Sequence, residues 1–305
     1  MRRYILKRII LAIITLVFVS IIVFVAARLS GDVALLLAPE DATEEELQAI
    51  RVEHGLDKPI PVQYYVYVRN ALKGDFGQSI KYEQPAIRLI FDRIPATLQL
   101  GSVAFAVSLL MGILLGIVSS TRRNSWLDWC GKIFAMLGQS IPAFWLGIML
   151  ILLFGVNLGW LPTSGRGGIA NMVMPVFSMA YFTIAGNMRM TRSAMLEIMD
   201  SEYVKMARIK GNPERVVIWK HALRNALIPV VAMAGMGLAM MVGGQVIIES
   251  IFRWPGVGSL MVDAIFYRDY TLVQAGVLVI STAIVTINLL VDLSFVIIDP
   301  RIKYE

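Results

Sequence analysis

The segment IILAIITLVFVSIIVFVAA, from Ile9 to Ala27, is an almost unbroken apolar run. Because roughly 20 apolar residues cross a bilayer core as a helix, this segment is long enough to span a membrane. A signal peptide is the alternative, since Val25-Ala26-Ala27 resembles a cleavage site. Signal-peptide cores usually have only about 7 to 15 residues, so we interpret the segment as a retained transmembrane helix.

The rest of the chain continues this pattern. Of its 305 residues, 57% are hydrophobic and 16% are charged, whereas soluble proteins have roughly a quarter charged residues. Further apolar stretches lie at about 96–119, 133–158, 172–190, 226–248 and 271–298. The fourth is the least apolar, because Thr183, Gly186 and Asn187 interrupt it. The sequence therefore predicts an all-α integral membrane protein with six transmembrane helices.

The distribution of basic residues predicts the orientation, because cytoplasmic loops are enriched in Lys and Arg. The predicted cytoplasmic basic residues are Arg2, Arg3, Lys7, Arg8, Arg122, Arg123, Lys132, Arg189, Arg192, Lys205, Arg208, Lys210, Arg215, Lys220, Arg224, Arg301 and Lys303. The short outer loops contain Arg166, Arg253 and Arg268. Both termini are thus predicted to be cytoplasmic, and the net charge of +6 follows membrane topology and does not indicate nucleic-acid binding.

Four regions follow from this topology: a first helix at 1–28, an outer segment at 29–95, a membrane core at 96–298 and a cytoplasmic tail at 299–305. In the outer segment, Thr43-Glu44-Glu45-Glu46 predicts a capping box, and Gly55 can end that helix in a left-handed conformation. A second helix is expected from about Val62 to Leu72, with Tyr64, Val68 and Leu72 on one apolar stripe and Gly74 at its end. A small extracytoplasmic cap results, either purely structural or used for docking.

The cytoplasmic segment 193–225 predicts a helix–turn–helix element. Glu197–Lys210 is polar with apolar residues every three to four positions, and Gly211-Asn212-Pro213 breaks it. A second helix, Glu214 to Asn225, leads into span five. Composition leaves open whether this element lies on anionic lipid or docks a protein.

At these residues the chain resembles the inner-membrane permeases of dipeptide, oligopeptide and nickel ABC importers. The resemblance rests on EYVKMARIKG (Glu202–Gly211), HALRNALIP (His221–Pro229), FRWPGVG (Phe252–Gly258), RDY (Arg268–Tyr270), DPRIKY (Asp299–Tyr304), GLDKP (Gly55–Pro59) and KGDFG (Lys73–Gly77). It covers nearly the whole chain. One departure is that the general Glu-Ala-Ala motif is replaced by Lys205-Met206-Ala207, so its docking contacts transfer only loosely.

The resemblance implies a type I importer permease fold in a bacterial inner membrane. It also implies a second permease, two ATPase subunits that bind ATP and Mg, and an extracytoplasmic binding protein. The cytoplasmic element would sit in a groove of the ATPase. The implied coupling residues are Glu202, Tyr203, Ala207, Arg208, Lys210, Gly211, His221, Arg224 and Asn225. We expect small Ala207 to face the partner closely and Gly211 to permit a sharp turn.

The chain shows no signature of its own catalysis. It has no G-x-x-x-x-G-K-[ST] phosphate loop, so no cofactor is expected on this chain and ATP hydrolysis is expected on partner subunits. Cys130 is the single cysteine, and no Cys/His cluster predicts a metal site. We therefore predict a non-catalytic membrane subunit.

Polar residues inside spans are candidates for the translocation path, because unpaired polar groups are costly in lipid. They are Gln99, Gln139, Ser140, Asn187, Gln245 and Asn288. Hydrogen bonding between helices is the alternative role for each. Gly112-x-x-x-Gly116 and Gly243-Gly244 predict close helix packing, and Asp292 is expected to pair with a basic loop residue.

Within the importer interpretation, peptides, glutathione-like peptides and nickel chelates stay open as substrates. An ATP-independent secondary transporter or channel is the main rival. Such proteins usually carry intramembrane carboxylates or inverted repeats, which the sequence does not display. A membrane scaffold that only binds lipid or a partner is the second rival, and it leaves the ordered series of motifs unexplained.

Overall fold

The fold is known from a computed structural model, which describes residues 2–29, 31, 34–35, 38–39, 41–53 and 55–298. The side chains of 2–4, 236, 238–244 and 293–298 are not described, and the predicted tail at 299–305 lies outside the described residues. The described secondary structure is helical, with one isolated β-bridge between Gln78 and Pro85. The chain divides into two compact units, residues 1–97 with 255–305, and residues 98–254.

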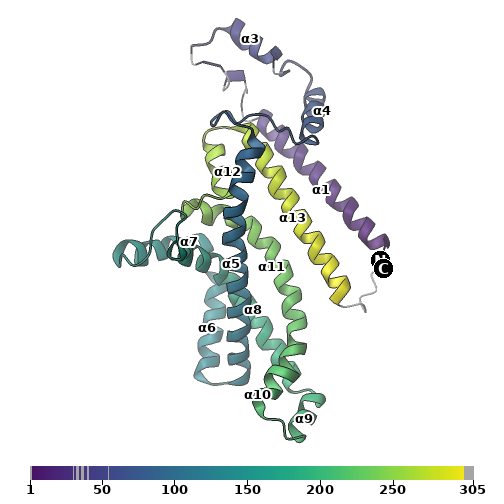
Figure 1. The fold of residues 1–305 in the computed structure, drawn as a ribbon, viewed down its shortest axis with the longest axis vertical. Helices are drawn as coiled ribbons and strands as arrows, with labels where there is room; N and C mark the ends of the chain where they lie inside the picture. The colour runs from purple at the N-terminus through teal and green to yellow at the C-terminus, as the bar shows by residue number, and fades with distance from the viewer. Residues whose placement is uncertain are drawn as a thin grey trace. The chain divides into compact units, whose positions relative to one another are not determined.

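The first unit contains α1 (Arg2–Leu29), α3 (Glu44–Glu53), α4 (Ile60–Ala71), the start of α5 (Ala86–Thr121), α12 (Val257–Phe266) and α13 (Tyr270–Ile298). Helices α1 and α13 lie side by side (Figure 1). The guanidinium of Arg8 binds the Asp292 carboxylate at 2.9 Å. Asp292 thus pairs with a basic residue as expected, although Arg8 lies in a helix and not in a loop.

The outer cap forms as its local signals predict. The Thr43 backbone N–H donates to Glu46 Oε2 at 2.8 Å, and the Glu46 N–H donates to Thr43 Oγ1 at 3.4 Å, which closes the capping box. The Thr43 N–H and the Thr43 hydroxyl both donate to the Glu46 carboxylate, and these two bonds lower the pKa of that carboxyl. In α4, Tyr64 bonds Ser20 of α1 at 2.7 Å. Leu72, however, is 84% exposed, so its predicted place on the packed stripe is wrong.

The second unit holds the rest of α5, α6 (Trp126–Ser140), α7 (Ala143–Leu150), a π-helical segment (Ile151–Asn157), α8 (Ile169–Met199), α9 (Glu202–Ile209), α10 (Glu214–Val216), a second π-helical segment (Val217–Ala222) and α11 (Leu223–Ile251). Helix α8 packs against both α6 and α11. It also contacts α7, α9 and the second π-helical segment, and is therefore the central helix of this unit.

Among the described residues, five helices are long and apolar enough to cross a membrane, within residues 5–29, 86–121, 169–199, 214–235 and 270–292. The sixth candidate is a bent pair, α6 followed by α7 and its π-helical extension, with an angle of 106°. The predicted span at 133–158 is therefore broken near Ile141 and Pro142 and is not one straight helix. Pro142 lacks an N–H and holds Ile141 in an extended conformation, which ends α6.

The predicted close packing at Gly112 and Gly116 is confirmed. A Cβ atom on Gly112 would lie 2.4 Å from Asn187 Cβ, and one on Gly116 would lie 2.8 Å from the Met188 backbone oxygen. Such distances exclude a side chain, so α5 and α8 approach through these glycines. The packing of Gly243 and Gly244 lies outside what the structure describes.

Candidate functional site

The predicted helix–turn–helix element at 193–225 differs from its prediction in the bounds of its helices. The predicted helix 197–210 is interrupted, because α8 ends at Met199 and Ser201 adopts an extended conformation before α9. The predicted end of the second helix at Asn225 is also wrong, because the chain stays helical from Glu214 to Ile251. Gly211 has φ +80°, which confirms the expected tight turn.

The inner face of α9 packs against the base of the following helix. Val204 and Ala207 are buried against Val217. The Arg208 guanidinium donates to both Glu214 carboxylate oxygens, at 2.9 and 3.2 Å. Within this chain Ala207 packs against Val217, and its close approach to a partner stays a prediction. These contacts fasten α9 to the helix that continues into α11, so the two can move together.

The outer face of α9, which points away from Val217, is exposed. Glu202 and Lys205 pair with each other at 2.8 Å and are largely exposed. Two apolar side chains beside them, Met206 and Ile209, are 52% and 78% exposed. Neither residue was among the predicted coupling residues, although an apolar pair spaced by three on a polar helix is visible in the sequence. An exposed apolar strip rimmed by charge is typical of an interaction surface.

The remaining predicted coupling residues lie around this strip. The Asn225 amide donates to the Tyr203 hydroxyl at 2.8 Å, which links α9 to α11. His221 is half-buried in the second π-helical segment. Lys210, Gly211 and Arg224 are exposed. The structure thus brings the predicted set together on one element, with Ala207 as its inward member.

The Arg208–Glu214 pair gives a first testable expectation. Replacing Glu214 with Gln should lower the free energy of unfolding by about 1 kcal/mol, because the pair is bidentate but half-exposed. Glu202→Gln is the matched control, since the Glu202 side chain is 90% exposed, and it should change stability less. Thermal unfolding of both variants in the same detergent measures the difference. Equal effects would contradict a fastening role for Arg208.

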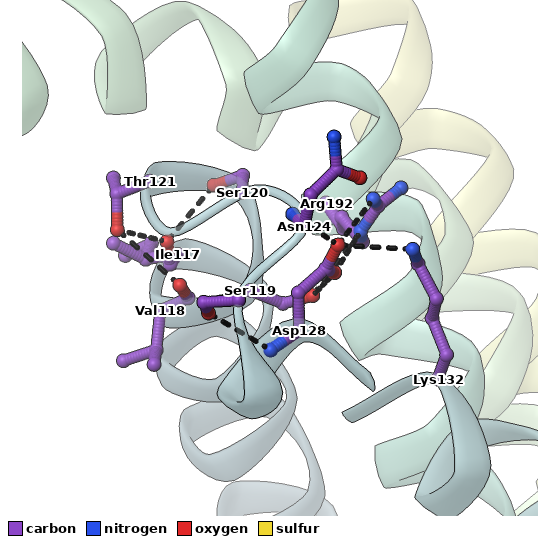
Figure 2. A network of polar contacts seen from close by, with 10 residues as sticks. Ile117, Val118, Ser119, Ser120, Thr121, Asn124, Asp128, Lys132 and Arg192 are labelled. Atoms are coloured by element: carbon purple, nitrogen blue, oxygen red, sulfur yellow. Dashed lines mark hydrogen bonds and ion pairs between the residues drawn. The ribbon is translucent and has the colours of Figure 1, made fainter. Parts of the chain in front are cut away.

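A buried charge cluster, which the sequence analysis did not predict, joins α5, α6 and α8. Asp128 of α6 is fully buried, and its carboxylate accepts from Arg192 at 2.8 and 3.1 Å. Lys132 binds the same carboxylate at 2.9 Å, and the Ser119 hydroxyl donates to it (Figure 2). Lys132 therefore lies inside α6, not in the predicted loop. The cluster ties the α5–α6 hairpin to α8, seven residues before α8 ends.

A cavity of about 570 Å³ lies at the bend between α6 and α7. Three of the predicted path residues, Gln139, Ser140 and Asn187, line it. The others lie elsewhere: Gln99 accepts hydrogen bonds from Arg166, at 2.6 Å for the shorter, and Gln245 packs onto Gly101. Asn288 is exposed on α13, in the other unit. The structure thus gathers half of the predicted path residues at one cavity and leaves the role of all six untested.

Two family models together match most of the chain. Residues 112–304 match the model of the binding-protein-dependent transport system inner membrane component, and residues 1–101 match the model of its N-terminal region. The chain belongs to this family. It is thus a multi-pass inner-membrane permease of a transport complex, as the sequence resemblance predicted.

Relatives of this permease align along its full length. A putative peptide transport system permease protein of Brucella abortus (strain 2308) is 40% identical over 314 residues, with complete coverage of both chains. A glutathione transport system permease protein of Pectobacterium atrosepticum is 39% identical over 306 residues, again with complete coverage. The crystal structure of an amino acid ABC transporter with histidines aligns with TM-score 0.55 and 15% identity, covering 68% of the permease and 92% of that chain. The structural likeness supports the fold.

Two motifs of the permease that carried the resemblance have structural roles. Trp254 of FRWPGVG is fully buried, and the Phe252 carbonyl accepts from the Gly165 N–H at 2.9 Å. Asp269 of RDY is also buried, and its carboxylate accepts from the Ser79 hydroxyl and from the Lys81 and Leu272 N–H groups. Asp269 therefore fixes the start of α13 to the outer segment.

Proposed function

We propose that this permease is a membrane subunit of an ATP-driven importer of short peptides. It pairs with a second permease and two ATPase subunits, which bind ATP and Mg, and receives substrate from an extracytoplasmic binding protein. The chain itself is non-catalytic, and both termini lie in the cytoplasm. The names of the peptide and glutathione relatives support this substrate class.

The proposal rests on the two faces of α9, one packed against the helix that continues into α11 and the other exposed. Its inner face is fastened to the base of α11 by Arg208–Glu214 and by the buried Ala207, while its outer face presents Met206 and Ile209. An ATPase that binds the outer face can therefore move α9 and α11 as one body. In our proposal this motion alternates access to the substrate path.

The test is ATP hydrolysis by the complex purified through this chain and reconstituted with its binding protein and peptide. Ile209→Glu should lower peptide-stimulated hydrolysis at least about tenfold, because it places a charge where an apolar side chain is expected to be buried by the partner. Ile209→Met is the matched control, since it keeps an apolar side chain and should retain the activity. Assembly of each variant is checked by co-purification of the ATPase.

Two results would contradict the proposal. Full stimulation in the assembled Ile209→Glu complex would show that this face of α9 does not transmit the ATPase signal. If no ATPase co-purifies and the chain alone moves solute in liposomes, the secondary-transporter interpretation takes its place.

A further inference from the structure

A groove of about 370 Å³ lies between the end of α1 and the start of α13. Both helices are candidate membrane spans, and they lie side by side within one compact unit. Where the two helices form its wall, the groove is lined by aliphatic side chains, which are Ile22, Val23, Ala26, Ala27, Val273 and Val277. The wall of the groove therefore has the polarity of a bilayer core.

The ion pair at the other end of these helices indicates the depth of the groove. Arg8 of α1 binds Asp292 of α13 at 2.9 Å. The helical rise of α13 places Tyr270, its first residue, about 33 Å from Asp292, close to the roughly 30 Å of a bilayer core. A Cβ atom on Gly31 would lie 3.5 Å from the Tyr270 hydroxyl, so Tyr270 is level with the end of α1. Because Tyr270 also lines the groove, this end of the groove lies at the membrane surface.

A cation lines the groove at the same end. Arg268, which precedes α13, is exposed, and its guanidinium has no hydrogen bond or ion pair within the described part of the chain. The neighbouring Asp269 does not neutralise it by contact, because the Asp269 carboxylate is buried and bonded to the outer segment. A second cation is close, since the Lys81 ammonium lies 4.3 Å from the centre of the Tyr267 ring. This end of the groove is therefore positively charged.

The residues just before Arg268 also suit the membrane surface. Phe266 is 81% exposed and Tyr267 is 53% exposed. Aromatic and basic side chains gather at the depth of the lipid headgroups in membrane proteins. The groove is thus aliphatic between the two spans and cationic at the headgroup level, which is the pattern that an acyl chain and an anionic headgroup require.

We propose that this groove binds one phospholipid with an anionic headgroup. The headgroup pairs with Arg268, with added attraction from Lys81, and one acyl chain lies between α1 and α13. In the orientation proposed above, the lipid belongs to the outer leaflet. This inference goes beyond the transport function and does not depend on which substrate is imported.

The test is photo-crosslinking in the intact complex, held in nanodiscs with equal amounts of dioleoyl phosphatidylglycerol and dioleoyl phosphatidylcholine. Ile22, which lines the groove, is replaced by p-benzoylphenylalanine, and mass spectrometry identifies the captured lipid. We expect about fivefold more phosphatidylglycerol than phosphatidylcholine, because one basic residue near the surface attracts an anionic lipid by about 1 kcal/mol. The same crosslinker at Ile21 is the matched control. Ile21 is exposed on α1 but does not line the groove, so its ratio should be close to that of the bilayer.

Arg268→Gln, made in the Ile22 crosslinking background, should lower the preference to the ratio found at Ile21, whereas Arg268→Lys should keep it. Arg88→Gln should leave it unchanged, because Arg88 is exposed in the same unit and does not line the groove. Equal ratios at Ile22 and Ile21, a preference that survives Arg268→Gln, or capture of a protein in place of lipid at Ile22 would each overturn the site.

A soluble headgroup separates a lipid site from a site for phosphate alone. Glycerol 3-phosphate, added at constant ionic strength, should leave the ratio at Ile22 unchanged, because it has no acyl chain to occupy the groove. Loss of the preference on its addition would show a site for a free phosphate group and would also overturn the lipid site.

Discussion

Replacing Asp128 with Asn should lower the free energy of unfolding by about 3 to 5 kcal/mol, because removing one partner of a buried ion pair leaves the other charge uncompensated. The Asn side chain has nearly the same shape, so the change removes charge and not volume. Arg192, whose side chain is 21% exposed, would lose its ionic partner and keep at most one hydrogen bond, to the Asn Oδ1, because the NH₂ group that replaces the other oxygen is a donor. The thermal unfolding temperature of the purified complex measures the effect.

Two further variants test whether the lost stability comes from the uncompensated charge or from altered packing around residue 128. Arg192→Met combined with Asp128→Asn should recover part of the lost stability, because no guanidinium is then left without its carboxylate. The third member of the cluster, Lys132, is 38% exposed and can be hydrated. Ser119→Ala should cost only about 1 kcal/mol, since it removes one hydroxyl donor from a carboxylate that keeps its cations. An Asp128→Asn complex within about 0.5 kcal/mol of wild type would contradict a structural role for the cluster.

Local signals predicted the features that depend on a few neighbouring residues. The capping box at Thr43 and Glu46, the turn at Gly211 and the close approach at Gly112 and Gly116 follow from steric and hydrogen-bonding rules that act over short distances. The apolar runs likewise located the membrane helices. Their lengths were underestimated, because helices continue into polar segments, as α8 does to Met199.

The bend at Pro142 was missed for a different reason. Apolar residues lie on both sides of Ser140-Ile141-Pro142, so the average hydropathy of the segment stays high. This average does not reveal that one helix ends at Ser140 and another begins at Ala143. The proline itself was a sufficient local signal, since it restricts the preceding residue and cannot donate to the helix. Residues at this break, Ile141, Pro142 and Ala143, line the cavity.

Contacts between distant residues could not be predicted from one sequence. Asp128 and Arg192 belong to different helices, and their pairing depends on how α6 and α8 pack. Ala207 is another example, because the face that a short helix presents inward is decided by its neighbour, here Val217. The sequence predicted a polar helix with apolar residues at α9. Only the structure shows which of these residues are buried, Val204 and Ala207, and which are exposed, Met206 and Ile209.

The contact between α5 and α8 leads to the second large effect. Gly116→Leu should destabilise the permease by more than about 3 kcal/mol, above the usual cost of overpacking, because even its Cβ atom would lie 2.8 Å from a backbone oxygen of α8. Gly116→Ala should also be destabilising. The sign of its change in the free energy of unfolding is informative. Ala favours a helix over Gly by about 1 kcal/mol, so Gly116→Ala would stabilise α5 if space were available.

Gly168→Leu is the matched control, because a Cβ atom there meets nothing within 4 Å and its φ of −83° suits any residue. Thermal unfolding of the three variants in one detergent gives the comparison. We expect the unfolding temperature to change little for Gly168→Leu and to fall strongly for Gly116→Leu. That result would show that the lost stability comes from the contact between α5 and α8. An unfolding temperature for Gly116→Ala equal to or above wild type would mean that α5 and α8 do not meet at this glycine, since the gain in helix propensity would then face no opposing clash.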